Sequence, residues 1–202
     1  MGKDEIKKEQ ILDAAMSCLA RYGAVKATMD DIAALIGMKK ASLYYYYKNK
    51  EAIFSDAIER DAIRLLSEIK AKFKDSQTAT EKIYAFSIAI VQFLKERAEL
   101  MDLNVQAMLD NHILIQNLHK KLKEKNVDFM ADLIREGIDN GEFSDGDPKK
   151  AADAIRTMME ALRLELFLSL QSPRPTSADF EMLEKDTMYL LDLILNGLKT
   201  RK

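Results

Sequence analysis

Hydrophobic and polar positions alternate along this chain with the spacing of α-helices, and polar or glycine-containing segments separate the runs. Apolar residues recur at three- and four-residue intervals in several long segments: 4–22, 49–73, 80–97, 100–110, 113–140, 148–171 and 178–197. Only 7 Gly and 3 Pro occur in 202 residues, a composition that favours helix. Together with two short helices within 28–47, the pattern predicts an all-α fold of about nine helices.

Residues 28–51, TMDDIAALIGMKKASLYYYYKNKE, hold the two short helical patterns on either side of a glycine. Thr28, with Asp31 three residues later, predicts a capped helix start. Gly37 supplies the left-handed residue that commonly ends a helix. A second helix follows from about Lys39 and directs Leu43 inward. The segment therefore predicts a helix-turn-helix, whose second helix can enter the DNA major groove.

Residues 37–51, GMKKASLYYYYKNKE, resemble the signature of the TetR/AcrR family of bacterial transcriptional regulators. The direct matches are Gly37, Leu43, Tyr44, Asn49, Lys50 and Glu51, and the near substitutions are Met38, Ser42, Tyr46 and Tyr47. The run 11–15 with Tyr22-Gly23 resembles the family's first helix. Lys39 departs from the family, which often has a helix-capping serine at that position.

The resemblance implies a three-helix DNA-binding head at residues 1–50. A helix at about 49–73, capped by Asn49, would link it to a ligand-binding and dimerisation body at 74–202. The function implied is a repressor that binds a palindromic operator as a homodimer and is released by a small, largely apolar effector.

The charge distribution agrees with a local DNA-binding surface on an acidic chain. Residues 1–50 hold nine Lys or Arg and six Asp or Glu, whereas the remainder holds 22 and 27. The basic side chains gather at Lys39, Lys40, Lys48 and Lys50. This pattern is typical of a small, specific DNA contact rather than a nonspecific nucleic-acid coat.

Two kinds of DNA contact are expected on the second helix of the pair. Lys40 and Ala41 can read base edges, and the family resemblance adds Tyr44, for which core packing remains an alternative. The remaining candidates suit phosphate oxygens, which fix register but carry no sequence information: Thr28, Ser42, Tyr45, Tyr46 and Lys50, with Lys39 beside them. Tyr47 is assigned to the core. A helical hairpin with a solvated lysine face is the simpler alternative for the whole segment.

The last two helices, about 148–171 and 178–197, carry apolar residues around most of their circumference. Such helices need cover on every side, so we expect one face to meet the core and the other to meet a second subunit. Leu191 and Leu195 are expected at that dimer interface. A fully internal helix pair is the alternative. Asp147 before Pro148 predicts the start of the first helix, and Ser177 that of the second.

The middle helices contain Met and Phe residues that suit an adaptable apolar pocket. The expected ligand-binding residues are Phe86, Phe93, Met101, Met108, Phe129, Met130, Met158, Met159 and Leu162. Ordinary core packing explains the same spacing. Asn104, Gln106, His112 and Arg156 are the polar groups that could orient a ligand there.

Other functions have little support in the sequence. His112 and His119, with Asp110 nearby, form a sparse pattern without the spacing of a zinc helix, and we expect no catalytic residue, metal or cofactor. Cys18 is expected in the core. Residues 1–10 are polar and no apolar run could span a bilayer, so a cytoplasmic location without membrane contact is expected. The alternative function is that of a helical dimer that binds a ligand or a protein but not DNA. A gel-shift screen would distinguish the two functions, because only the regulator would shift DNA.

Overall fold

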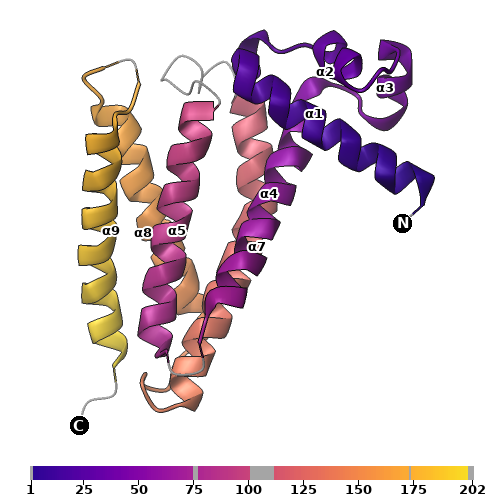
Figure 1. Ribbon diagram of the computed structural model, residues 1–202. Helices are drawn as coiled ribbons and strands as arrows, with labels where there is room; N and C mark the ends of the chain where they lie inside the picture. The colour runs from indigo at the N-terminus through magenta and orange to yellow at the C-terminus, as the bar shows by residue number, and fades with distance from the viewer. Residues whose placement is uncertain (1, 75–76, 101–111, 173, 200–202) are drawn as a thin grey trace. The chain divides into compact units, whose positions relative to one another are not determined.

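The computed structural model describes residues 2–74, 77–100, 112–172 and 174–199, and leaves out the side chains of residues 3, 100 and 112–120. Eight α-helices lie within these ranges (Figure 1): α1 Lys3–Lys26, α2 Met29–Leu35, α3 Lys40–Tyr46, α4 Lys50–Lys72, α5 Ala79–Leu100, α7 His112–Asp139, α8 Pro148–Ser169 and α9 Ser177–Leu198. The predicted all-α fold is confirmed. The helix expected at 100–110 lies almost entirely outside the described residues.

The chain divides into two compact units. Unit 1 consists of residues 1–64 and 96–121, and unit 2 consists of residues 65–95 and 122–202. Unit 1 therefore contains the whole helix-turn-helix segment together with a second, distant stretch of chain. No helix in the described part of either unit is both long and apolar enough to cross a membrane.

The core of unit 1 is formed by apolar side chains from α1 to α4. The most deeply buried are Ile11, Ala15, Cys18, Leu19, Ile32, Leu43, Ile53 and Phe54. Cys18 is thus the core residue that was expected. Two apolar residues of α1, Ile6 and Tyr22, are exposed, although the spacing of apolar residues along 4–22 predicts that both lie on the buried face. Gly23 has a left-handed φ of 72° and breaks the regular helix there.

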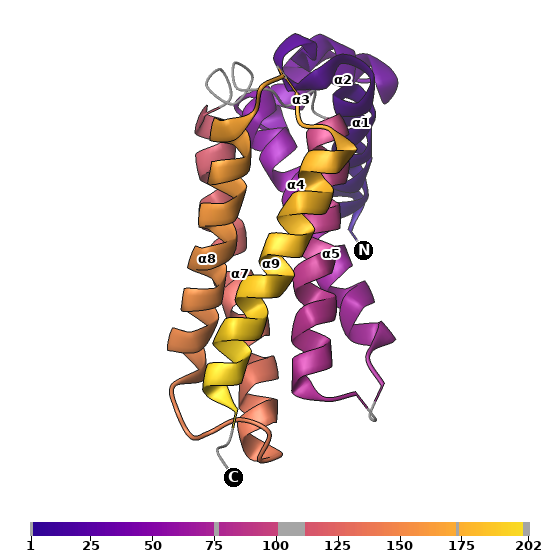
Figure 2. The same ribbon diagram turned by 90° about the vertical axis from the view of Figure 1, so that its left-hand side faces the viewer.

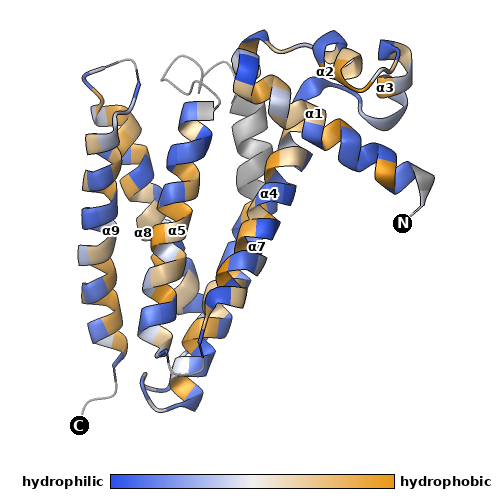
Figure 3. Cartoon of the chain, viewed as in Figure 1, coloured by the Kyte–Doolittle hydropathy of each residue, from blue (hydrophilic) through white to orange (hydrophobic). Residues whose placement is uncertain are grey.

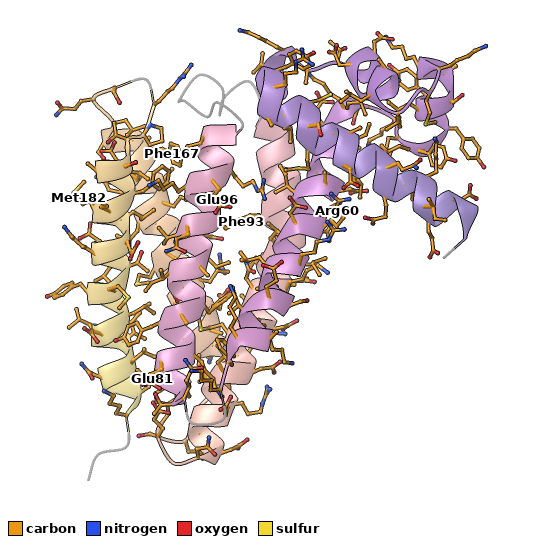
Figure 4. All side chains as sticks on the ribbon, in the orientation of Figure 1. Arg60, Glu81, Phe93, Glu96, Phe167 and Met182 are labelled. Atoms are coloured by element: carbon orange, nitrogen blue, oxygen red, sulfur yellow. The ribbon has the colours of Figure 1, made fainter. Side chains whose placement is uncertain are left out.

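Ion pairs join the segments of unit 1 around α4. Arg60 contacts Glu9 at 3.0 Å and Asp13 at 2.9 Å, which ties α4 to α1; Figure 4 labels Arg60 on α4. Asp61 accepts from Arg97 at 3.0 Å. Lys121 on α7 pairs with Asp56 and, at 2.9 Å, with Glu59. The distant stretch 96–121 is therefore attached to α4 by charged groups that are only partly exposed.

Unit 2 is a helical bundle with its own apolar core. Its most buried members are Ile83, Phe86, Met130, Ile134, Ile155, Leu191 and Leu195. Asp147 accepts hydrogen bonds from the backbone N–H groups of Lys149 and Lys150, which confirms the predicted cap with Pro148 at the first position of α8. The start of α9 was predicted one residue late. Thr176 is the cap, because its side chain and that of Asp179 form a reciprocal capping box.

Helices α8 and α9 lie side by side in both views (Figures 1 and 2), and Figure 3 shows hydrophobic and hydrophilic residues along the visible side of α9. Leu191 and Leu195 are buried within unit 2, so the expectation that they lie on an outer face is wrong. Other large apolar side chains are exposed on these helices: Leu164, Leu168, Met182, Tyr189 and Leu193. Figure 4 labels Met182 near the start of α9.

Candidate nucleic-acid interface

Local hydrogen bonds define both ends of α2. The Thr28 side chain accepts from the backbone N–H of Asp31 at 3.2 Å, and the Thr28 backbone N–H donates to the Asp31 carboxylate at 2.9 Å. This is the predicted capping box. At the other end Gly37 has a φ of 63°, and the N–H of Met38 donates to the carbonyl of Ala33 at 2.9 Å. This pattern is a Schellman turn, and it redirects the chain into α3.

Helix α3 is fixed by one inward side chain and presents most of the others to solvent. Leu43 is fully buried, whereas Lys40, Ala41, Ser42, Tyr44 and Tyr45 are exposed, Tyr45 to 83%. Lys39 is also exposed and caps α3 without a side-chain hydrogen bond, consistent with the absence of a serine there. A short helix held by a single buried leucine leaves a broad face available for a partner.

The tyrosines 44–47 occupy distinct environments. Tyr44 is about half exposed, so the core-packing alternative for it is not supported. Tyr46 is half-buried, and its hydroxyl lies 3.5 Å from Asp4; burial, then Asp4, raises its pKa. Tyr47 is half-buried as well. Burial, followed by the negative charge of Asp56, raises its pKa, which agrees with a packing role.

Lys40, the main candidate for base contact, is paired within unit 1. Its ammonium donates to the Asp30 carboxylate at 2.6 Å, and this bond raises the pKa of Lys40. Both side chains are about half exposed or more, at 47% and 64%. Exposed pairs of this kind contribute roughly 0–1 kcal/mol, so a guanine edge or a phosphate can compete for the ammonium. No motif in the sequence indicates that Asp30 is this partner.

Lys50 has a different role from the one expected. Its ammonium donates to the carbonyl oxygens of Ala24, Val25 and Ala27 at 3.0, 2.8 and 2.8 Å. An ammonium has three N–H donors, and all three are used within unit 1. The Lys50 ammonium therefore has no N–H donor left for a phosphate oxygen. Asn49, next to it, accepts from the N–H of Ala52 at 2.9 Å and caps α4 as predicted.

The described candidates for ligand binding lie in unit 2, where a cavity of about 70 Å³ opens between α5, α7, α8 and α9. Phe86, Met130 and Met159 line it, as does Arg156. The other described candidates are not among its lining residues: Phe93, Phe129, Met158 and Leu162. Phe129 packs instead against the rings of Phe73 and Phe86. Met101 and Met108 lie outside the described residues.

The metal or acid–base alternative gains no support from the part of the chain that is described. Asp110, like the possible ligand-orienting Asn104 and Gln106, lies outside the described residues, as do the side chains of His112 and His119. Elsewhere in the described ranges, no three His, Cys, Asp or Glu side chains are grouped so that they could hold a metal ion.

Comparison with known proteins supports the prediction of a DNA-binding helix-turn-helix in the N-terminal segment. Residues 11–57 match the family described as bacterial regulatory proteins of the tetR family. The chain is 28% identical over 128 residues to the biofilm operon icaADBC negative transcriptional regulator IcaR of Staphylococcus epidermidis, covering 63% of this chain and 68% of that protein.

Solved structures extend the similarity to the whole fold. A transcriptional regulator from Cytophaga hutchinsonii aligns with a TM-score of 0.79 and 26% identity, covering 96% of this chain and 99% of that one. The regulator FadR of Bacillus subtilis, solved with stearoyl-CoA, has a TM-score of 0.63 and 22% identity, with coverage of 94% and 98%. The matched residues 11–57 contain the capped α2, the Gly37 turn and the exposed face of α3. Residues 11–57 therefore belong to the TetR family of helix-turn-helix transcriptional regulators, and the fold of the whole chain is that of a solved transcriptional regulator.

Proposed function

We propose that this regulator is a repressor that binds a palindromic operator as a homodimer and is released by a small effector. The observation that carries the proposal is the face of α3, where one buried leucine leaves Lys40, Ala41, Tyr44 and Tyr45 exposed. The name of IcaR as a negative regulator supports repression. The stearoyl-CoA in the FadR structure supports a ligand-responsive family member.

The DNA contacts are assigned by position on this face. Lys40, Ala41 and Tyr44 read base edges, because they are exposed on the helix that is expected to enter the major groove. The phosphate contacts are Lys39, Ser42, Tyr45 and Tyr46. Thr28 is not among them, because its hydroxyl donates to the Asp31 carboxylate at 2.6 Å. Residues 1–50 carry these contacts, and residues 74–202 carry ligand binding and dimerisation.

The dimer interface is formed by the exposed apolar residues of α8 and α9. Leu164 and Leu168 are one helical turn apart, and Met182, Tyr189 and Leu193 follow at intervals of seven and four. These spacings place each set on one helix face. Large exposed apolar patches mark interaction sites, and a two-fold axis through this face would join two copies in a four-helix bundle. The symmetry of the dimer would then match a palindromic operator.

The effector acts by differential binding. It releases the operator only if it binds the DNA-free arrangement more tightly than the DNA-bound one. A coupling of about 1–3 kcal/mol is typical, and operator DNA must weaken effector binding by the same factor.

The DNA-binding assignment can be tested with fragments from upstream of the protein's own gene. We expect DNase I protection of a palindromic sequence. In anisotropy titrations, Lys40→Ala should cost about 1–3 kcal/mol and relax preference at one position in each half-site. Tyr45→Ala should weaken all sequences alike. Lys72→Ala, at an exposed lysine near the end of α4, is the control. Equal loss on every sequence for Lys40→Ala would contradict its assignment to base contact.

A further inference from the structure

The cavity of unit 2 contains charged and polar groups as well as an apolar wall. Phe86, Ile90, Val91, Met130 and Leu183 supply the apolar lining. The charged lining residues are Arg156, Glu160 and Arg163, and Asn126 and Thr187 add neutral polar groups. An apolar cavity with a few polar groups is typical of a ligand site, because the polar groups orient the ligand.

Two of these polar groups make no hydrogen bond among the described residues. Thr187 is 1% exposed, and its hydroxyl oxygen is buried without a hydrogen bond there. Arg163 is half-buried and is assigned neither a hydrogen bond nor an ion pair in the same part of the chain. Burial lowers the pKa of its guanidinium. A buried donor without a partner costs free energy, so both groups are sites where an acceptor would be stabilised.

The charged groups around the cavity are unevenly paired. Arg156 donates to Asp153 at 2.8 Å and also pairs with Glu160. Glu160 attracts Arg163, while Arg156 repels it. Arg156 therefore has two carboxylate partners, whereas Arg163 has none at ion-pair distance in the described part of the chain. An anion could take that place at Arg163, whereas a cationic ligand would be repelled by its guanidinium group.

We propose that the cavity binds an amphipathic molecule with an oxyanion head group, held by Arg163 and Thr187, with its apolar chain against Phe86, Met130 and Leu183. Guanidinium groups bind carboxylate and phosphate oxygens through paired N–H donors. The cavity of about 70 Å³ is small, so Met130 and Met159 must adjust to admit the chain, which flexible methionines do readily. This inference rests on the proposed effector function and narrows its chemistry.

The test uses four probes that share an eight-carbon chain and differ in the head group. Octanoate, octyl phosphate, 1-octanol and octylamine are titrated calorimetrically into the full-length protein without DNA. We expect octanoate or octyl phosphate to bind at least tenfold more tightly than octanol, and octylamine to bind weakest. Whichever of octanoate and octyl phosphate binds with the higher affinity identifies the preferred head group as a carboxylate or a phosphate. Equal affinities for octanoate, octyl phosphate and octanol, or no binding by either anion, would overturn the proposal.

Variants then assign the head-group contact. Arg163→Met should reduce anion affinity to that of octanol and leave octanol binding unchanged, and Arg163→Lys should retain part of the preference. Thr187→Val, which keeps the shape of the side chain, should also weaken the anion. Arg135→Met is the matched control, since Arg135 is exposed on α7 and pairs with Asp132 outside the cavity. Unchanged anion affinity in a folded Arg163→Met would contradict the assignment.

Operator release is measured separately with the same probes. Anion binding without operator release would support the cavity chemistry and contradict the effector role. Operator release by the anions with no dependence on Arg163 would contradict the site and support the regulatory function.

Discussion

At the scale of single residues, one ammonium group joins three parts of the helix-turn-helix unit. Lys50, at the start of α4, binds carbonyl oxygens at the end of α1 and in the turn before α2. These carbonyls lie next to the break at Gly23, where the regular helical bonds are interrupted. Lys50 therefore satisfies backbone groups that have no helical partner.

We expect Lys50→Met to reduce the free energy of unfolding by about 2–3 kcal/mol, because hydrogen bonds from a charged donor would be lost. The measurement is urea unfolding followed by circular dichroism. Lys48→Met is the control, since Lys48 is exposed, and it should have almost no effect. If Lys50→Met left stability intact but reduced the salt dependence of DNA binding, Lys50 would be a phosphate contact after all.

A second prediction for a single residue concerns Asp31 and the pH dependence of stability. Hydrogen bonds from Thr28 hold the pKa of Asp31 below its ordinary value of 3.8. The stability that this carboxylate contributes is therefore present above pH 3.8 and is lost as the pH falls through the lower pKa of the folded state. Wild type should exceed Asp31→Asn in stability at pH 6, and the difference should shrink towards pH 3. A difference independent of pH would contradict this account.

At the scale of helices, the end of α7 packs unusually closely against the turn that follows it. A Cβ atom at Gly137 would lie 2.3 Å from the ring of Phe143 and 3.0 Å from the Cβ of Ala79. The backbone N–H of Phe143 donates to the carbonyl of Gly137 at 3.0 Å, and that of Ser144 donates to Leu198 at 2.7 Å. The turn is thus held against both α7 and the end of α9.

Gly137→Ala should destabilise the protein by about 1–3 kcal/mol, because the added methyl overpacks this contact. Gly197→Ala is a matched control within α9, where nothing lies within 4 Å of the added atom. That substitution should stabilise by roughly 0.5–1 kcal/mol through helix propensity. Thermal and urea unfolding would measure both. In the Gly137→Ala variant, replacing Phe143 by a smaller side chain should restore part of the lost stability. If it does not, the strain does not arise from the contact with the Phe143 ring.

The success of the sequence predictions depended on how local each interaction is. The caps at Thr28, Asn49 and Asp147 and the turn at Gly37 involve neighbours within a few residues, so the sequence alone predicted them. The Thr176 cap was missed, although Asp179 three residues later was an available signal. The carbonyls bound by Lys50 are 23 to 26 residues away, and beside a DNA-binding motif a lysine is easily taken for a phosphate contact.

The faces of α8 and α9 were harder to assign for a different reason. A helix with apolar residues on all sides has no polar face that would fix its rotation. Leu191, Leu193 and Leu195 are therefore equivalent in the sequence, yet the structure buries the first and last and exposes the middle one. The residues that line the cavity could not be predicted either, because the lining depends on tertiary packing. Phe86 lines the cavity, whereas Phe129 does not.

At the scale of the whole molecule, the exposed apolar residues of α8 and α9 determine whether two copies of the chain can form the proposed dimer. Leu168, 72% exposed, and Leu193 would each be buried in the proposed dimer. Leu168→Glu and Leu193→Glu should weaken dimerisation at least about 100-fold, or roughly 3 kcal/mol, because an unpaired carboxylate would be buried. Both variants should keep the helical content of the wild type.

Sedimentation velocity at micromolar concentration would measure this effect. Lys123→Glu adds the same carboxylate at an exposed position on α7 and should remain dimeric. A wild-type protein that sediments as a monomer would contradict the proposed dimer. Dimers that persist in both glutamate variants would place the interface on another surface.

The division of the chain into two compact units also affects the design of chimaeric regulators, in which the DNA-binding part of one protein is joined to the C-terminal part of another. Unit 1 is discontinuous, and its second stretch is attached to α4 through Arg97 and Lys121. A DNA-binding cassette cut at residue 50, or even at residue 64, would leave Asp56, Glu59 and Asp61 without these partners or remove them altogether. Chimaeras with a foreign C-terminal part would therefore need to retain residues 96–121 as well as 1–64 in order to transplant operator specificity intact.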